Sequence, residues 1–119
     1  MPRVKIEIRK GRTEEHKQKL LQAVHDALVE AIKIPEHDRI QTLYEHEEQN
    51  FEVSTGKTEM FTLIEIIMFP GRSIEAKRNL YTAIVRNLEQ LGIEVRDIMI
   101  IYKSLLWKTG GYWGSRQVK

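Results

Sequence analysis

Residue 2 carries a group that could do acid-base chemistry at the start of the chain. Pro2 follows Met1 directly, so removal of Met1 would give the proline a free secondary amine. An α-amino group titrates at about pH 8, which is close enough to neutral for proton transfer under physiological conditions. A proline after the first methionine is also common in chains where it has no catalytic role. The rest of the sequence is needed to choose between these two interpretations.

The residues after Pro2 predict a strand that would hold this amine in place. Val4, Ile6 and Ile8 alternate with charged residues, which is typical of a strand with one buried face. Most chain termini fray, whereas a strand that begins at residue 2 fixes the position of the terminal group. Such an early strand also argues against a cleaved leader.

A helix and a second strand are predicted to follow. Thr13 is a suitable N-cap, and acidic residues occupy the first turn, where the helix dipole favours them. Pro35 ends the helix, because the residue before a proline is driven out of helical geometry. Residues 39–44 predict a strand, and a helical connection of this length favours a parallel pair with a right-handed crossover. The apolar face of the helix consists of Leu20, Leu21, Val24, Ala27, Leu28, Ala31 and Ile32.

The same succession of elements is predicted a second time, after a polar connection that could contain a short strand at residues 51–53. Residues 62–69 are nearly all apolar, which predicts a strand buried on both faces. Ser73 can cap a second helix, Gly92 can end it, and residues 98–102 predict a last core strand. The apolar face of this helix consists of Leu80, Tyr81, Ile84, Leu88 and Leu91.

An internal repeat relates the two halves. The Gly-Arg-Thr sequence at residues 11–13 recurs 60 positions later as Gly-Arg-Ser. The repeats span residues 2–44 and 62–103, with a linker at 45–61 and a tail at 104–119. One strand-helix-strand unit cannot bury its own face, so the two units are expected to share one sheet. We therefore predict a single α/β domain of the α+β type, residues 1–119, with a four-stranded mixed sheet, both helices on one face and a C-terminal hairpin. Matching positions include Lys17 and Lys77, Leu20 and Leu80, Ala23 and Ala83, Leu28 and Leu88, and, after one deletion, Ile34 and Ile93 as well as Asp38 and Asp97.

The tail contains both tryptophans of the chain, Trp107 and Trp113. Its hairpin is predicted to turn at residues 109–111, which have the sequence Thr-Gly-Gly. We expect this hairpin to pack on a neighbouring chain or to close a pocket.

The composition excludes several classes of function. The net charge is only +2 and both signs are interspersed, so no basic surface for nucleic acid is indicated. There is no cysteine, which excludes disulfides and thiolate chemistry and fits a reducing cytoplasm. No apolar run is long enough to span a membrane. His16, His25, His37 and His46 lack a metal-site spacing with a carboxylate, so they are predicted to be surface residues.

These features together resemble the tautomerase superfamily, the group of 4-oxalocrotonate tautomerase and macrophage migration inhibitory factor. The shared features are a proline after Met, a first strand, a Gly-Arg-Thr/Ser helix start and a duplicated β-α-β unit. The turn at residues 34–41, Ile-Pro-Glu-His-Asp-Arg-Ile-Gln, is similar to the corresponding turn of malonate semialdehyde decarboxylase and its relatives. The resemblance covers residues 2–106.

The resemblance implies a homotrimer without a metal or organic cofactor, and a terminal proline that acts as general base or general acid. That role falls on Pro2, the acidic residue of the decarboxylase-like branch falls on Asp38, and its substrate-carboxylate arginine falls on Arg72. The branch usually has a pair of arginines around a proline, but here Phe69 or Pro70 takes the partner position. This departure counts against decarboxylation more than against membership of the superfamily.

The chemistry of a keto-enol tautomerase fits these residue types. It needs a base of near-neutral pKa, a cation for the substrate carboxylate and a group that stabilises the enolate. Pro2 is the candidate base, Arg72 can bind a carboxylate through two parallel hydrogen bonds, and Asp38 could orient a water molecule or the proline nitrogen. We therefore expect tautomerisation of a small 2-oxo acid, such as an aryl pyruvate. Decarboxylation or hydration of a 3-oxo or unsaturated acid is a second interpretation, and a non-catalytic binding module on the same fold is a third.

Three further residues, Gln41, Tyr102 and Trp113, could line the substrate pocket or could serve in packing alone. Apolar side chains around the terminal amine, namely Ile6, Ile40 and Ile66, would disfavour its charged form and lower its pKa.

The approximate two-fold symmetry of the repeat separates the two arginines. It is expected to set Arg72 beside the start of the first strand and Arg12 beside Phe61 and Thr62, where no free amine exists. Arg12 is therefore predicted to be a surface or interface cation.

The sheet face away from the helices bears on assembly. The apolar strands at residues 63–69 and 98–102 would leave this face exposed in a monomer. We therefore expect a homotrimer whose three sheets face a common axis.

Overall fold

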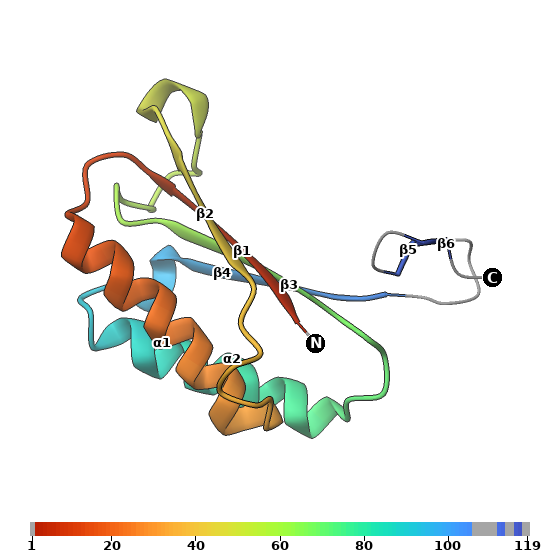
Figure 1. Cartoon of the computed structure of the whole chain (residues 1–119). Coiled ribbons are helices and arrows are strands. Elements are labelled where there is room, and N and C mark those ends of the chain that lie inside the picture. The colour runs from red at the N-terminus through yellow and green to blue at the C-terminus, as the bar shows by residue number, and fades with distance from the viewer. Residues whose placement is uncertain (1, 106–111, 114–115, 118–119) are drawn as a thin grey trace.

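Two helices lie on one face of a four-stranded sheet, as Figure 1 shows. The structure is a computed structural model that describes residues 2–105, 112–113 and 116–117, the last two pairs by their backbone. It has the predicted α+β architecture. No helix in this described part is long and apolar enough to cross a membrane. The elements are β1 (Arg3–Arg9), α1 (Glu14–Ile32), β2 (Gln41–His46), β3 (Thr62–Met68), α2 (Ile74–Glu89) and β4 (Ile98–Ser104), with 3-10 helices at Glu48–Asn50 and Val95–Asp97.

The strand order is β2-β1-β3-β4, which confirms the predicted mixed sheet. β1 runs parallel to β2, β3 runs parallel to β4, and β1 and β3 are antiparallel at the centre. The two parallel pairs have the same register: Ile8 lies opposite Glu45, and Met68 lies opposite Ser104. Positions in the outer strands therefore correspond at an offset of 59 residues, whereas β1 and β3 correspond at 60.

The core lies between the sheet and the helices. Alternate residues of β1 and β3 point into it, and Ile6, Ile64 and Ile66 are completely buried. Burial of each such side chain stabilises the fold by about 1.5–3 kcal/mol. The helices contribute Leu20, Val24, Ala27, Leu28, Leu80, Ala83, Ile84 and Leu88 to this core.

Both helices begin and end at the predicted signals. The side-chain oxygens of Thr13 and Ser73 accept hydrogen bonds from backbone N–H groups three residues later, at 3.1 and 3.0 Å. After α1, Lys33 adopts a left-handed conformation with φ of 60°, and Pro35 follows. After α2, Gly92 lies in the same region with φ of 85°, which glycine adopts without a steric cost.

The second strand is displaced from its prediction. β2 covers residues 41–46, whereas the sequence pattern predicts residues 39–44. The displacement follows the backbone pairing, because the N–H of Lys10 still donates to the carbonyl of His46 at 2.9 Å and so extends the ladder beyond β1.

The predicted short strand at residues 51–53 is wrong. Phe51 instead follows the 3-10 helix, and its carbonyl accepts a hydrogen bond from Nε of Arg9 at 2.9 Å. The Phe51 ring also makes edge contacts with the rings of His46 and Phe61. A side chain and two rings thus hold this segment in place of strand pairing.

The prediction that β3 is buried on both faces is wrong for the single chain. Its burial alternates, so that Leu63, Glu65 and Ile67 are only half-buried on the face away from the helices. No layer of the described chain covers this face (Figure 1). Glu65 forms an ion pair with Lys103 of the adjacent strand at 3.1 Å.

Two side-chain predictions on the helices are also wrong. Tyr81 is 36% exposed, and Ala83 takes its place in the core. His25 is not a surface residue but is 1% exposed, and its Nε2 lies 2.8 Å from the carbonyl oxygen of Glu36. Among the described side chains, no group of three His, Asp or Glu residues could hold a metal ion.

The C-terminal hairpin lies further along the chain than predicted. Tyr112–Trp113 and Arg116–Gln117 form antiparallel strands β5 and β6. The predicted turn at residues 109–111 lies outside the described residues, and so does Trp107.

Candidate active site

Pro2 lies buried at the edge of the core. It precedes β1 and continues the alternation that also buries Val4 beneath the helices. Arg3 pairs with Ile67, so the start of the chain lies beside the end of β3, from which the chain passes to α2 (Figure 1). An amine at Pro2 would therefore border apolar side chains, and burial disfavours the charged form of an amine.

Arg72, Lys77 and Tyr102 gather near the start of α2. Arg72 is exposed and immediately precedes the N-cap, and Nζ of Lys77 lies 5.0 Å from the centre of the Tyr102 ring. The Tyr102 hydroxyl is buried and has no hydrogen-bond partner among the described residues. Burial raises the pKa of Tyr102, and the positive charge of Arg72 partly opposes this rise. The hydroxyl is therefore held in its neutral form, which can donate a hydrogen bond.

Asp38 lies half-buried in the turn before β2, where its N–H donates to the carbonyl of Pro35 at 3.0 Å. Two residues later, the carbonyl of Ile40 accepts a hydrogen bond from the N–H of Val4 at 3.0 Å. The segment that carries Asp38 therefore runs beside the start of β1, on the side of Pro2.

Of the other two predicted pocket residues, Gln41 lies apart from this group, and the side chain of Trp113 is not among those described. Gln41 donates its side-chain amide to the carbonyl of Leu21 at 3.0 Å, which ties β2 to α1. This contact supports the packing interpretation of Gln41. Trp113 belongs to β5, and its side chain lies outside the described part of the structure.

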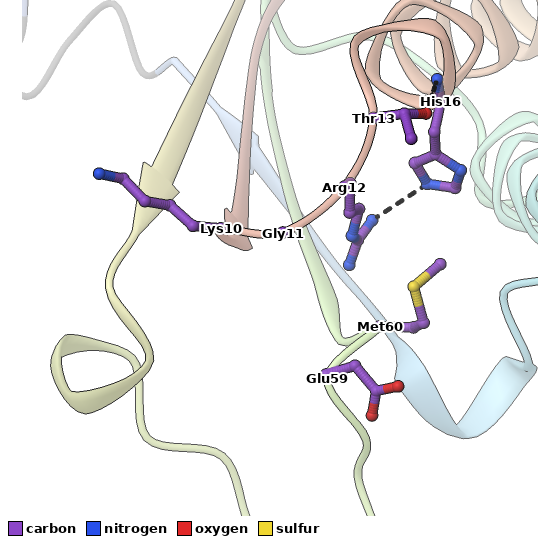
Figure 2. A pocket seen from close by; sticks show the side chains of 7 residues that line it. All are labelled: Lys10, Gly11, Arg12, Thr13, His16, Glu59 and Met60. Atoms are coloured by element: carbon purple, nitrogen blue, oxygen red, sulfur yellow. Dashed lines mark hydrogen bonds between the residues drawn. The ribbon is translucent and has the colours of Figure 1, made fainter.

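Arg12 occupies the corresponding place at the start of α1, where Figure 2 shows it bordering a cavity. Its guanidinium donates to the hydroxyl of Thr62 at 3.1 Å and to the carbonyl of Phe61 at 3.0 Å, as the repeat predicts. Burial lowers the pKa of Arg12 to about 10, although the charge of Asp97 opposes this shift. Of the two predicted alternatives for Arg12, the surface cation is wrong, and the interface cation stays a prediction. The cavity has a volume of about 360 Å³ and is lined by Lys10, Gly11, Arg12, Thr13, His16, Glu59 and Met60.

The two ends of the sheet are related by the repeat offset. At 60 residues, Thr62 corresponds to Pro2 and Arg12 corresponds to Arg72. Thr62 and Pro2 are both buried on the helix face. Arg12 contacts Thr62 across the two units, and Arg72 and Pro2 are the residues at the corresponding positions.

A carboxylate also lies near Arg12. Asp97 corresponds to Asp38, is 2% exposed, and accepts hydrogen bonds from the N–H and the hydroxyl of Thr58 at 2.8 and 2.6 Å. These bonds lower the pKa of Asp97 although its burial would raise it. Arg12 from the first unit and Asp97 from the second thus lie near the start of β3, and Arg72 and Asp38 are the residues at the corresponding positions.

Sequence comparison finds relatives over both halves of the chain. Two family models described as "Tautomerase enzyme" match residues 38–113 and residues 2–56. Probable tautomerase YusQ of Bacillus subtilis (strain 168) is 30% identical over 107 residues, which cover 85% of this chain and 84% of YusQ. Probable tautomerase YrdN of the same organism is 28% identical over 106 residues, which cover 84% of this chain and 81% of YrdN.

Solved structures share the fold. FG41 malonate semialdehyde decarboxylase superposes with a TM-score of 0.80 at 29% identity, over 86% of this chain and 82% of that chain. A second malonate semialdehyde decarboxylase structure gives a TM-score of 0.82 at 28% identity, over 96% and 92% of the two chains. A fused 4-OT that forms an asymmetric trimer gives a TM-score of 0.81 at 19% identity, over 96% of this chain and 94% of that chain. The last likeness shows the fold alone.

Proposed function

Since this chain belongs to the tautomerase enzyme family, we propose that it catalyses keto-enol tautomerisation of a small 2-oxo acid. In this proposal Met1 is removed and the amine of Pro2 is the general base. The observation that carries the proposal is the burial of Pro2 on the apolar face of the sheet, beside the core residue Val4. Burial favours a neutral amine, which is the form that can accept a proton.

The reaction moves one proton between carbon and oxygen. The neutral nitrogen of Pro2 removes a proton from the carbon beside the keto group, the electron pair moves to form the enolate, and the proton is then delivered to oxygen. Arg72 holds the substrate carboxylate through charge-assisted hydrogen bonds. The unpartnered hydroxyl of Tyr102 supplies a donor to the oxygen on which negative charge develops. Amine, hydroxyl and guanidinium groups suffice for these steps, so the proposal requires no metal or organic cofactor.

Decarboxylation or hydration is the second candidate. The likeness to malonate semialdehyde decarboxylase at 28 and 29% identity favours it. That chemistry would use a cationic proline, and the nearby carboxylate of Asp38 would stabilise the cation. A non-catalytic binding module is the third candidate. Such a module would not need a free amine on Pro2.

We also propose a homotrimer. The sheet face away from the helices carries apolar side chains that the single chain leaves open, including Met99 at 48% exposure and Tyr44 at 43%. Leu63, Ile67 and Ile101 on the same face are half-buried. The trimeric state of a fused 4-OT with the same fold supports this assembly.

Turnover of phenylenolpyruvate by the wild type and by Pro2→Ala tests the central claim. We expect a large loss of kcat/KM in the variant, because a primary amine on alanine differs in basicity and rigidity. Equal rates in both proteins would exclude Pro2 as the base. Intact-mass analysis of the native protein is the companion measurement, since retention of Met1 would leave no amine on Pro2.

A further inference from the structure

Two lysines at corresponding places have different surroundings. In α1, Nζ of Lys17 lies 2.9 Å from a carboxylate oxygen of Glu14 and 3.1 Å from one of Glu45. The Lys17 side chain is 12% exposed, and its charge is neutralised by these two carboxylates. Lys77 occupies the same position in α2, at an offset of 60 residues.

The carboxylates that neutralise Lys17 have no counterparts in the second unit. Glu14 corresponds to Ile74 in the helix, and Glu45 corresponds to Ser104, because Ile8 pairs with Glu45 where Met68 pairs with Ser104. Neither Ile74 nor Ser104 can carry a negative charge. Lys77 is half-buried all the same, and in the described part of the chain it forms no ion pair.

The surroundings of Lys77 are those of the candidate active site. Its Nζ lies over the Tyr102 ring at 5.0 Å, a cation-π contact that does not neutralise the charge. The hydroxyl of that tyrosine is buried without a partner, and Arg72 acts electrostatically on the same group. Two cations and one free hydroxyl therefore converge here, and the described residues supply no carboxylate that is paired with either cation.

We propose that Lys77 is a substrate-binding residue that shares the substrate carboxylate with Arg72. A half-buried cation without an ion-pair partner among the described residues gains from an anionic ligand, because the interaction of two charges strengthens as the ligand excludes water from the site. The proposal rests on the proposed function, whose site it extends. The first unit neutralises its own lysine, so the same position there has no such role.

Lys77 could alternatively have a structural role that depends on its apolar stem and not on its charge. Its methylene stem could cover apolar surface while the ammonium group stays in water. Lys77→Met keeps most of that apolar cover and removes only the charge, whereas Lys77→Arg keeps the charge. The matched control is Lys17→Met, which removes the corresponding charge from the first unit.

The experiment is a calorimetric titration of the full-length protein with benzoate, a carboxylate that has no enolisable carbon. We expect Lys77→Met to weaken benzoate binding about 10-fold, the usual scale for one charged contact, and Lys77→Arg to stay within about threefold of the wild type. Lys17→Met is expected to bind benzoate like the wild type. In turnover of phenylenolpyruvate, Lys77→Met should raise KM more than it lowers kcat.

Four results would overturn the proposal. Two concern the variants: Lys77→Met binds benzoate as tightly as the wild type, or Lys17→Met loses as much benzoate affinity as Lys77→Met. The other two are that the wild type does not bind benzoate, or that Lys77→Met lowers kcat while its KM is unchanged. Circular dichroism at the titration temperature separates these results from misfolding, and Lys77→Arg provides the second reading if Lys77→Met does not fold. Benzoate binding does not depend on Pro2 chemistry. Loss of turnover in the wild type with normal benzoate results would therefore count against the proposed function and not against Lys77.

Discussion

Arg12 donates a hydrogen bond to the hydroxyl of Thr62 over 3.1 Å, and Thr62 is the residue that corresponds to Pro2 in the other repeat. Arg12 is thus tied to the protein itself. Arg72, its counterpart at the start of α2, is exposed, and in the proposed function it binds the substrate.

Arg72→Ala is expected to weaken substrate binding and to leave folding intact. Loss of a charged carboxylate contact costs about 1.5–3 kcal/mol, which lowers kcat/KM for phenylenolpyruvate roughly 10-fold or more. Arg12→Ala is the matched variant. It removes the hydrogen bonds to Thr62 and Phe61 and a longer one to His16, so we expect it to lower the free energy of unfolding by about 1–3 kcal/mol. A stability loss in Arg72→Ala as large as that in Arg12→Ala would contradict this division of roles.

The pH dependence of turnover is expected to show a rising limb. A base has to be unprotonated, so tautomerase activity rises with pH through the pKa of Pro2, whereas a decarboxylase that uses a cationic proline would lose activity over the same range. Asp38→Asn removes a negative charge that stabilises the cation, and we expect the limb to move to lower pH. The profile of kcat/KM for both proteins checks this. A falling limb in the wild type, or an unmoved limb in Asp38→Asn, speaks for the other chemistry.

Asp97 is expected to stabilise the fold only when it is ionised. Burial would raise its pKa, but the hydrogen bonds from Thr58 hold it below the ordinary value of 3.8. The folded state thus binds this proton less readily than the unfolded state, so the contribution is complete above about pH 3.8 and is lost as the pH falls through the folded pKa. We expect Asp97→Asn to lower the free energy of unfolding at pH 7 by about 1–3 kcal/mol. Urea unfolding of the wild type and of Asp97→Asn across the acidic pH range measures this difference in stability. If the difference is the same at the lowest pH as at pH 7, the stabilisation does not come from the ionised form of Asp97.

Assembly is expected to be trimeric in solution. Sedimentation equilibrium at micromolar concentration should give three times the chain mass of 14.0 kDa. Met99→Glu places a charge on the open sheet face and should shift the protein toward smaller species. Val95→Glu is the control, because Val95 is 59% exposed but lies outside the sheet. A 14.0 kDa monomer in the wild type would contradict the trimer.

The fold could be predicted because independent local signals agree. Alternation in the first strand, the caps Thr13 and Ser73, and the 60-residue repeat all specify the same sheet. The errors arose where tertiary contacts replace local pattern, as at Phe51, whose backbone bonds to a side chain. The burial of His25 did have a signal, since it lies three residues before Leu28 and four after Leu21 on the apolar face.

The candidate site could be predicted only in part. Pro2 and Arg72 follow from the terminus and from the repeated helix start. Lys77 could not be found from its own sequence, because its significance lies in the absence of two carboxylates around it. The 60-residue repeat already sets Ile74 in the place of Glu14, but only the strand register shows that Ser104 stands where Glu45 would be.

The continuous backbone through Phe61 and Thr62 has a consequence for stoichiometry. Duplication has produced two similar strand starts in one polypeptide, but the second is joined to the preceding residue by a peptide bond and can never offer an amine. Each chain can therefore present one reactive proline at most. An amine-directed inactivator that acts at Pro2 should therefore reach full inhibition at one equivalent per chain. An assembly of three chains would contain six repeat-related strand starts, of which only three could have a reactive amine.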